Sequence, residues 1–185
     1  MTTLTELLQN GAPNAPAIGA PGRRPLSYAA LRALAERTIA DINSLGAGRG
    51  DAVAIVLPNG PEMAAAFVAI GAGAVTAPLN PAYTADEFEF YLDDLDAKLL
   101  IVQAGDETPA VGAAAKLGIP VARLTIEADT PAGEFRLRGE AAAATSGGPA
   151  GPEDIALVLH TSGTTARPKI VPLTHANVCA SAGNI

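Results

Sequence analysis

Four short, almost continuous apolar runs alternate with helical patterns along the chain, and this alternation restricts the possible folds more than any other feature. The runs are AVAIVL (52–57), VTAPLN (75–80), KLLIVQ (98–103) and IPVARLTI (119–126). An apolar run without polar alternation is typical of a strand that is covered on both faces. Strands separated by helices in this way indicate parallel crossover connections. We therefore predict an α/β fold with a doubly wound, largely parallel sheet flanked by helices.

Helix signals fill the segments between these runs. Ser27 is suited to be an N-cap, Pro61 suits a first helical position, and Thr84 and Glu87 have the spacing of a capping box. The expected helices cover residues 27–45, 61–71, 84–97 and, with a weaker pattern, 107–117. The apolar stripe of the third helix, which we expect to be buried, comprises Phe88, Tyr91, Leu92 and Leu95.

Composition changes at two places outside this core. Residues 1–25 hold a short amphipathic start and then a segment punctuated by proline and glycine, which we predict to be a loop. Residues 139–153, GEAAAATSGGPAGPE, are rich in Ala, Gly, Ser and Pro, as is typical of a mobile connection. We therefore predict an N-terminal α/β subdomain (1–138), a flexible connection (139–154) and the start of a second subdomain (155–185).

Charge and composition exclude several classes of protein. A net charge of −7 over 185 residues argues against a nucleic-acid partner, and we expect the adjacent Arg23 and Arg24 to be solvated in a turn. Cys179 is the single cysteine, which excludes an intramolecular disulfide, and we expect it to be buried or idle. No apolar run approaches the roughly 20 residues that span a bilayer, and the start lacks a basic signal region. We predict a soluble cytoplasmic chain.

The stretch LHTSGTTARPKIVPLTH (159–175) gathers hydroxyl side chains, a glycine and a lysine. It differs from the phosphate loop of the common NTPases, because Pro168 stands in place of the second glycine and Ile170 in place of the Ser or Thr. Its flanks, IALVLH (155–160) and KIVPLT (169–174), are typical of strands, whereas that loop opens a helix. We predict a loop between two extended segments.

The residue types in this loop still suit phosphate. Gly163 allows a sharp turn that presents amide N–H groups, and Lys169, one of three lysines in the chain, adds a positive charge with Arg167 nearby. Hydroxyl groups can donate to phosphate oxygens or face a hydrated Mg²⁺, for which Thr165 is the candidate. The candidate phosphate ligands are Thr161, Ser162, Gly163, Thr164, Thr165 and Lys169. Composition alone fits a Ser/Thr-rich hairpin loop without a ligand equally well.

In their order, these residues resemble the phosphate-binding signature of the adenylate-forming superfamily, usually T-S-G-T-T-G-x-P-K-G. That superfamily includes acyl-CoA synthetases, luciferases and the adenylation domains of peptide synthetases. The resemblance covers residues 4 to 185, because the LPN turn, the GAV…PLNP strand exit and the Thr-Ala-Asp-Glu helix start follow in family order. It implies the N-terminal lobe of an enzyme whose loop grips the phosphates of ATP, with Mg²⁺, while a carboxylate attacks the α-phosphate. The resulting acyl-adenylate then passes its acyl group to a thiol, often coenzyme A.

Within the superfamily, HTSGTT-x-RPK-x-VPLTH looks most like the oxalate–CoA ligases and neighbouring small-acid CoA ligases, because of His160 and Arg167. His160 also fits a histidine at a strand end whose ring is simply hydrogen-bonded. His175, with Asn177, is more typical of the start and cap of a helix than of chemistry. A fatty-acid or aryl-acid CoA ligase, a peptide-synthetase adenylation domain and a non-catalytic module that binds nucleotide weakly remain open.

Two positions depart from the usual signature. Ala166 and Ile170 replace glycines, and β-branched Ile170 would strain the loop if its position needs a positive φ or a close backbone approach. We therefore predict a lower affinity for ATP than that of Ile170→Gly. The resemblance also implies that the acid pocket, the Mg²⁺-coordinating glutamate, the ribose-binding aspartate and the catalytic lysine lie beyond Ile185. We expect residues 1–185 alone to be inactive and to associate with the remainder of the same enzyme.

Overall fold

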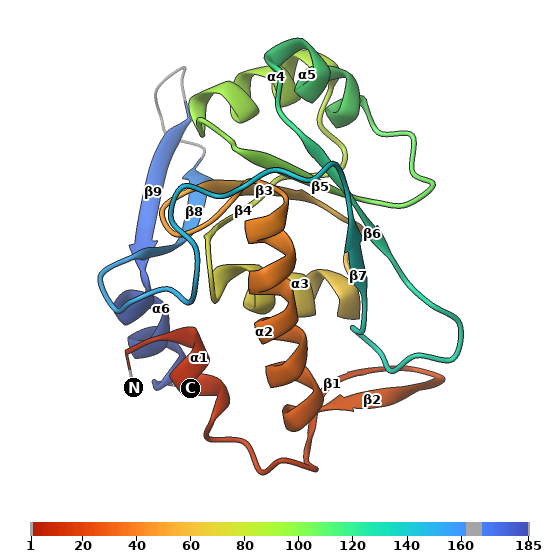
Figure 1. Ribbon diagram of the computed structural model, residues 1–185, viewed down its shortest axis with the longest axis vertical. Coiled ribbons are helices and arrows are strands. Elements are labelled where there is room, and N and C mark those ends of the chain that lie inside the picture. Colours follow the sequence, from red (N-terminus) through yellow and green to blue (C-terminus); the bar gives the residue numbers. More distant parts are fainter. Residues whose placement is uncertain (1, 162–167, 185) are drawn as a thin grey trace.

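The structure, a computed structural model, describes residues 2–161 and 168–184 (Figure 1). The helices are α1 (Leu4–Leu8), α2 (Tyr28–Ser44), α3 (Pro61–Gly71), α4 (Ala85–Asp94), α5 (Pro109–Leu117) and α6 (His175–Ala182). The strands are β1 (Pro16–Ala20), β2 (Arg23–Ser27), β3 (Ala52–Val56), β4 (Val75–Pro78), β5 (Leu99–Gln103), β6 (Val121–Thr125), β7 (Arg136–Arg138), β8 (Ile155–Thr161) and β9 (Lys169–Thr174). The four apolar runs of the sequence are β3, β4, β5 and β6.

A seven-stranded sheet organises the part of the chain that the structure describes. Its strand order is β7-β6-β5-β3-β4-β8-β9. The central pairs are parallel, and only β7 and β9, at the two edges, run antiparallel to their neighbours. Strand β4 lies on one side of β3, and the chain then crosses back so that β5 lies on the other side of β3. This reversal of strand order makes the sheet doubly wound. The predicted α/β fold is confirmed.

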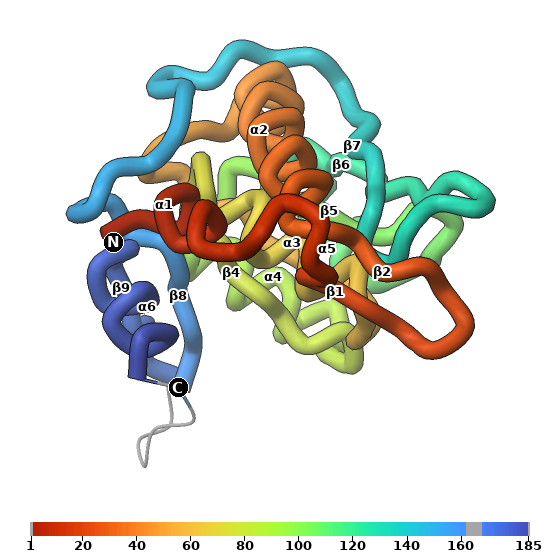
Figure 2. The backbone as a smooth tube through the Cα atoms, turned by 90° about the horizontal axis from the view of Figure 1, so that it is seen from below, coloured from red at the N-terminus to blue at the C-terminus, as the bar shows by residue number. Residues whose placement is uncertain are grey.

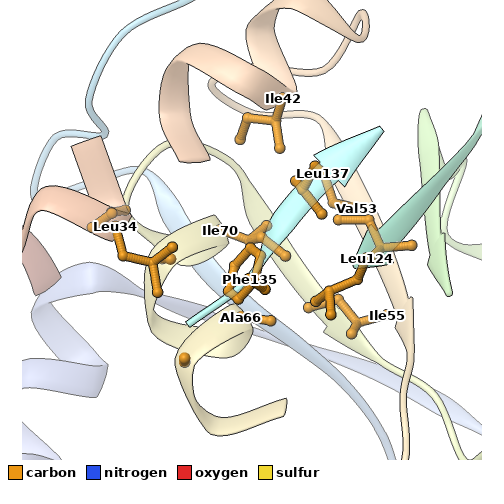
Figure 3. Close-up of a cluster of buried hydrophobic side chains, with 14 of the residues drawn as sticks. Leu34, Ile42, Val53, Ile55, Ala66, Ile70, Leu124, Phe135 and Leu137 are labelled. Carbon is orange, nitrogen blue, oxygen red and sulfur yellow. The ribbon is translucent and has the colours of Figure 1, made fainter. Parts of the chain in front are cut away.

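Helices cover both faces of this sheet, α2 and α3 on one face and α4 and α5 on the other (Figure 1). Successive residues of β3 point to opposite faces, so Val53 and Ile55 pack under α2 and α3, while Ala54 and Val56 pack under α4 and α5. Figure 3 shows the first of these two clusters, in which Ile70 of α3 lies among buried side chains of the sheet. Double coverage explains why the strand sequence is apolar at every position.

The helix starts follow the signals in the sequence. The Ser27 hydroxyl accepts a hydrogen bond from the Ala30 N–H at 3.2 Å and caps α2. Thr84 and Glu87 form the predicted capping box, in which the Thr84 N–H donates to Glu87 Oε2 at 2.8 Å and Thr84 Oγ1 accepts from the Glu87 N–H at 3.3 Å. Local side chain–backbone pairing therefore sets where these helices begin.

The loop prediction for the first 25 residues is wrong over the antiparallel hairpin of β1 and β2. Arg23, expected to be solvated, donates from Nη1 to Glu62 Oε1 at 2.6 Å and from Nη2 to the Pro131 carbonyl at 3.0 Å. The Gly133 N–H donates to the same Glu62 oxygen at 3.1 Å. Arg24 is exposed, as predicted. The hairpin is thus fixed by contacts with α3 and with the segment before β7.

The segment between β7 and β8 has irregular backbone that is hydrogen-bonded to the rest of the fold. The Ala142 N–H donates to the Ser44 carbonyl at 2.8 Å, and the Ala150 N–H donates to the Ala72 carbonyl at 2.9 Å. Because β8 pairs with β4, the strands after residue 154 continue the sheet of the preceding chain. The subdomain division at 139–154 stays a prediction.

The two ends of the described chain lie together. Helix α1 packs beside α6, as Figures 1 and 2 both show. The Leu4 N–H donates to His175 Nδ1 at 3.2 Å across this contact. None of the helices in residues 2–161 and 168–184 combines the length and the apolar character needed to cross a bilayer.

Candidate phosphate-binding site

The signature lies on the hairpin of β8 and β9, at the edge of the sheet. The antiparallel register pairs Thr161 with Lys169, His160 with Ile170 and Leu159 with Val171. Two extended strands therefore flank the stretch, as the sequence predicts, where a common NTPase loop would lead into a helix.

Two of the candidate phosphate ligands belong to the described residues. Thr161 and Lys169 are both exposed and lie opposite each other at the end of β8 and the start of β9. A hydroxyl donor and an ammonium group at one strand end suit an anionic ligand. The other candidates lie outside the described residues, and so their roles, including that of Thr165 towards magnesium, stay predictions: Ser162, Gly163, Thr164 and Thr165, with the neighbouring Ala166 and Arg167.

His160 points away from solvent, and only 7% of its side chain is exposed. Its Nε2 lies 3.1 Å from Oδ2 of Asp94, at the end of α4. A carboxylate can only accept, so Nε2 carries the hydrogen and donates it. The Tyr91 ring meets the imidazole edge to face, with 4.6 Å between the centroids. The prediction of a strand-end histidine with a hydrogen-bonded ring is confirmed.

The Tyr91 ring that contacts His160 belongs to a cluster of three aromatic side chains, Tyr83, Phe88 and Tyr91. Tyr91 stacks on Tyr83 with centroids 4.7 Å apart, and Tyr83 meets Phe88 edge to face at 5.7 Å. Burial, with a hydrogen bond that the Tyr83 hydroxyl donates to Tyr91, raises the pKa of Tyr83 to about 12. Tyr83 is therefore a neutral phenol at physiological pH, and the cluster offers His160 a rigid and uncharged support.

Ile170 occupies a regular strand position. Among the described residues other than glycine, only Asp96 and Asp129 have a positive φ. Ile170 pairs with His160 in the ladder, and the residue is 40% exposed. A β-branched residue suits such a strand. The positive φ that would strain Ile170 is absent, which removes this reason to expect a lower affinity for ATP. The affinity itself stays a prediction.

His175 begins α6, as predicted, and the cap is formed by its neighbours. Thr174 Oγ1 accepts from the Asn177 N–H at 3.2 Å, while Asn177 Oδ1 accepts from the Thr174 N–H at 3.1 Å. The His175 residue has no exposed surface. Burial lowers the pKa of its imidazole, against the opposing effect of the Asp154 carboxylate. The neutral ring holds α6 against the N-terminal segment through the Leu4 amide.

The residues that sequence reasoning missed here are those that contact His160. Tyr91 was expected only as a core residue of its helix, and Asp94 was not singled out. A weak signal does exist, because a carboxylate at a helix C-terminus opposes the helix dipole and the last turn of α4 has no basic residue. Among the described residues, no three His, Cys, Asp or Glu side chains are grouped as metal ligands.

Comparison with known proteins assigns the family. The sequence pattern of the family described as AMP-binding enzyme matches residues 8–185. The chain belongs to the AMP-binding enzyme family. The family resemblance of the TSGTT stretch is thereby confirmed.

Individual AMP-binding relatives match nearly the whole chain. The oxalate–CoA ligase of Arabidopsis thaliana is 42% identical over 193 residues, which cover 99% of this chain and 37% of the relative. A probable CoA ligase of Humulus lupulus, CCL9, is 40% identical over 195 residues, which cover 99% of this chain and 36% of the relative. The structure of ATP-bound MatB from Rhodopseudomonas palustris matches 98% of this chain and 36% of its own, with a TM-score of 0.76 and 29% identity. The chain thus spans little more than a third of these AMP-binding proteins.

Proposed function

We propose that this chain supplies the N-terminal, phosphate-binding part of an ATP-dependent acid–CoA ligase. Such an enzyme activates a carboxylate as an acyl-adenylate and then transfers the acyl group to coenzyme A. The observation that carries the proposal is the β8–β9 hairpin, which places Thr161 opposite Lys169 at an exposed strand end of an AMP-binding fold. The similarity to an oxalate–CoA ligase supports it.

The chemistry proposed for this hairpin is electrostatic. Adenylation moves negative charge onto the leaving pyrophosphate, and the ammonium group of Lys169 would stabilise that charge. The Thr161 hydroxyl would donate to a phosphate oxygen. Magnesium bound with ATP supplies further positive charge, and Thr165 is our candidate for indirect contact with it. In this proposal, Ser162, Gly163 and Thr164 complete the cradle.

The acid that we propose is oxalate, because the Arabidopsis relative carries that name and the HTSGTT-x-RPK pattern resembles its group. Coenzyme A is the proposed acceptor. Since ATP and coenzyme A are metabolites of the cell interior, we propose a cytoplasmic location. The remainder of the ligase, in the same or an associated polypeptide, would hold the acid.

The test uses the protein isolated from the cells that make it, with an antibody raised against this chain. Denaturing and native mass spectrometry first give the mass of the polypeptide and of any partner. The preparation then receives MgATP, coenzyme A and a panel of acids that begins with oxalate, and thioesters are identified by mass. We expect one small acid to give a CoA thioester and pyrophosphate. Absence of a thioester with every acid, including fatty and aryl acids, would reject the ligase.

A further inference from the structure

The end of β8 and the start of β9 extend beyond the part of β8 that pairs with β4. In the described residues, the ladder between β4 and β8 pairs Thr76 with Leu157, and β4 ends at Pro78. The last residues of β8 are paired only with β9, which is the edge strand. A two-stranded ribbon without further contacts is only marginally stable in water. The strand ends that carry Thr161 and Lys169 therefore need another anchor.

The His160 side chain is almost fully buried, although it lies near the end of the hairpin that precedes residue 162. The His160 side chain is 7% exposed, whereas Leu159 and Ile170, its neighbours along and across the ladder, are exposed residues. The ring lies on the α4 side of the sheet, between the Tyr91 ring and the Asp94 carboxylate. One hydrogen bond and one ring contact thus join the tip of the hairpin to a helix that belongs to the core.

The helix side of this contact is itself well fixed. Phe88 and Leu92 of α4 are fully buried, and the capping box at Thr84 holds the start of the helix. Asp94 is the last residue of α4, where a carboxylate is unfavourable for the helix alone and gains when it accepts a hydrogen bond. Because the Asp94 carboxylate is unfavourable for α4 itself, we look for the function of the Asp94–His160 contact outside the stability of that helix.

We propose that Asp94 and Tyr91 are positioning residues that act through His160. They hold the end of β8, and across the ladder the start of β9, so that Thr161 and Lys169 meet a polyphosphate in fixed geometry. This role rests on the proposed function, because the ligand that it serves is the phosphate chain of ATP. A misplacement of about 1 Å at such a site is costly for binding and for reaction.

The test uses the full 185-residue chain labelled with ¹⁵N, with Asp94→Ala, Asp94→Asn and Asp93→Ala variants. Three quantities are measured: the tautomer of the His160 ring, amide hydrogen exchange at residues 158–161 and 169–171, and the dissociation constant for MgATP from the amide shifts of Thr161 and Lys169. Asp93 is the matched control, because it is the adjacent exposed carboxylate at the same helix end. Thermal unfolding checks that each variant is folded.

We expect Asp94→Ala to lose the Nε2–H tautomer, and to raise both exchange at the tip and the MgATP dissociation constant by about tenfold. Asp94→Asn keeps an oxygen that accepts from Nε2–H, so it should stay within about twofold of the wild type. Asp93→Ala should change nothing, and exchange in β3 should be constant throughout.

Two results would overturn the positioning role of Asp94 and leave the proposed function standing. One is Asp94→Ala with wild-type exchange and MgATP affinity; the other is Asp94→Asn as impaired as Asp94→Ala, which would assign the effect to charge and not to position. No MgATP-dependent shift in the wild-type chain would overturn the phosphate contacts proposed for Thr161 and Lys169 together with this role, whereas the thioester assay tests the ligase separately.

Discussion

At the scale of single residues, the two histidines differ because their surroundings differ. His160 donates to a carboxylate at the edge of the fold, whereas His175 is wholly buried and accepts from a backbone amide. Burial lowers the pKa of His175 from its ordinary value of 6.5. The neutral imidazole is therefore the form on which the contact between α1 and α6 depends.

The lowered pKa of His175 predicts a loss of stability in acid. Below pH 6.5 the unfolded chain binds a proton before the folded chain does, so the contribution of His175 to stability is complete above that pH and is lost as the pH falls below it. Urea unfolding at about pH 7.5 and about pH 5.5 measures the difference. His175→Gln, which cannot titrate but can accept from Leu4, should lose less stability over this interval. Equal losses in both proteins would contradict the prediction.

Ile170 gives a second prediction at this scale. Because it lies in an extended strand, Ile170→Gly should cost about 1 kcal/mol of unfolding free energy, through backbone freedom and lost strand propensity. It should not tighten the binding of MgATP. The sequence alone predicted the opposite for binding, because the usual signature has a glycine at this position. A several-fold lower dissociation constant in Ile170→Gly, measured by the same amide titration, would restore the strain argument.

At the scale of elements, local signals account for those that were predicted and tertiary contacts account for those that were missed. Helices α2 and α4 begin at their capping residues, and β3 and β5 are apolar because helices cover both faces. The β1–β2 hairpin has no such pattern. It contains three prolines and depends on Arg23 reaching Glu62, which is 39 residues away in the chain. No local signal in the sequence marks that pairing.

The Arg23–Glu62 contact predicts that Arg23 contributes more to the free energy of unfolding than the adjacent Arg24 does. Arg23→Ala should lower the unfolding free energy by about 1 kcal/mol, because it removes hydrogen bonds to Glu62 and to the Pro131 carbonyl. Arg24→Ala is the matched control and should change it little, since Arg24 is exposed. Urea unfolding of the two variants measures the difference. Equal stabilities would show that the hairpin is held by its apolar contacts alone.

At the scale of the whole molecule, the sequence predicted the type of sheet and the position of the phosphate signature, but not the full strand order or the contacts of the site. Alternating runs predicted a doubly wound sheet, but not that β8 would lie beside β4, because that pairing joins residues about 80 positions apart. The phosphate signature was visible at Thr161 and Lys169. Its link to Asp94 was not, since α4 and β8 meet only in the folded chain. The sequence pattern predicts the candidate phosphate ligands, and the fold adds the contact between His160 and Asp94 beside them.

The central claim is that this hairpin holds the phosphates of ATP during adenylation. The most direct test joins residues 1–174 to the corresponding downstream part of the Arabidopsis oxalate–CoA ligase and measures oxalate-dependent exchange of pyrophosphate into ATP. Lys169→Met is compared with Lys98→Met, because Lys98 lies just before β5, an internal strand that β3 and β4 separate from β8. We predict exchange in the chimera, a loss of at least about tenfold in Lys169→Met, and no change in Lys98→Met. Wild-type exchange in Lys169→Met, or a folded chimera without exchange, would contradict the claim.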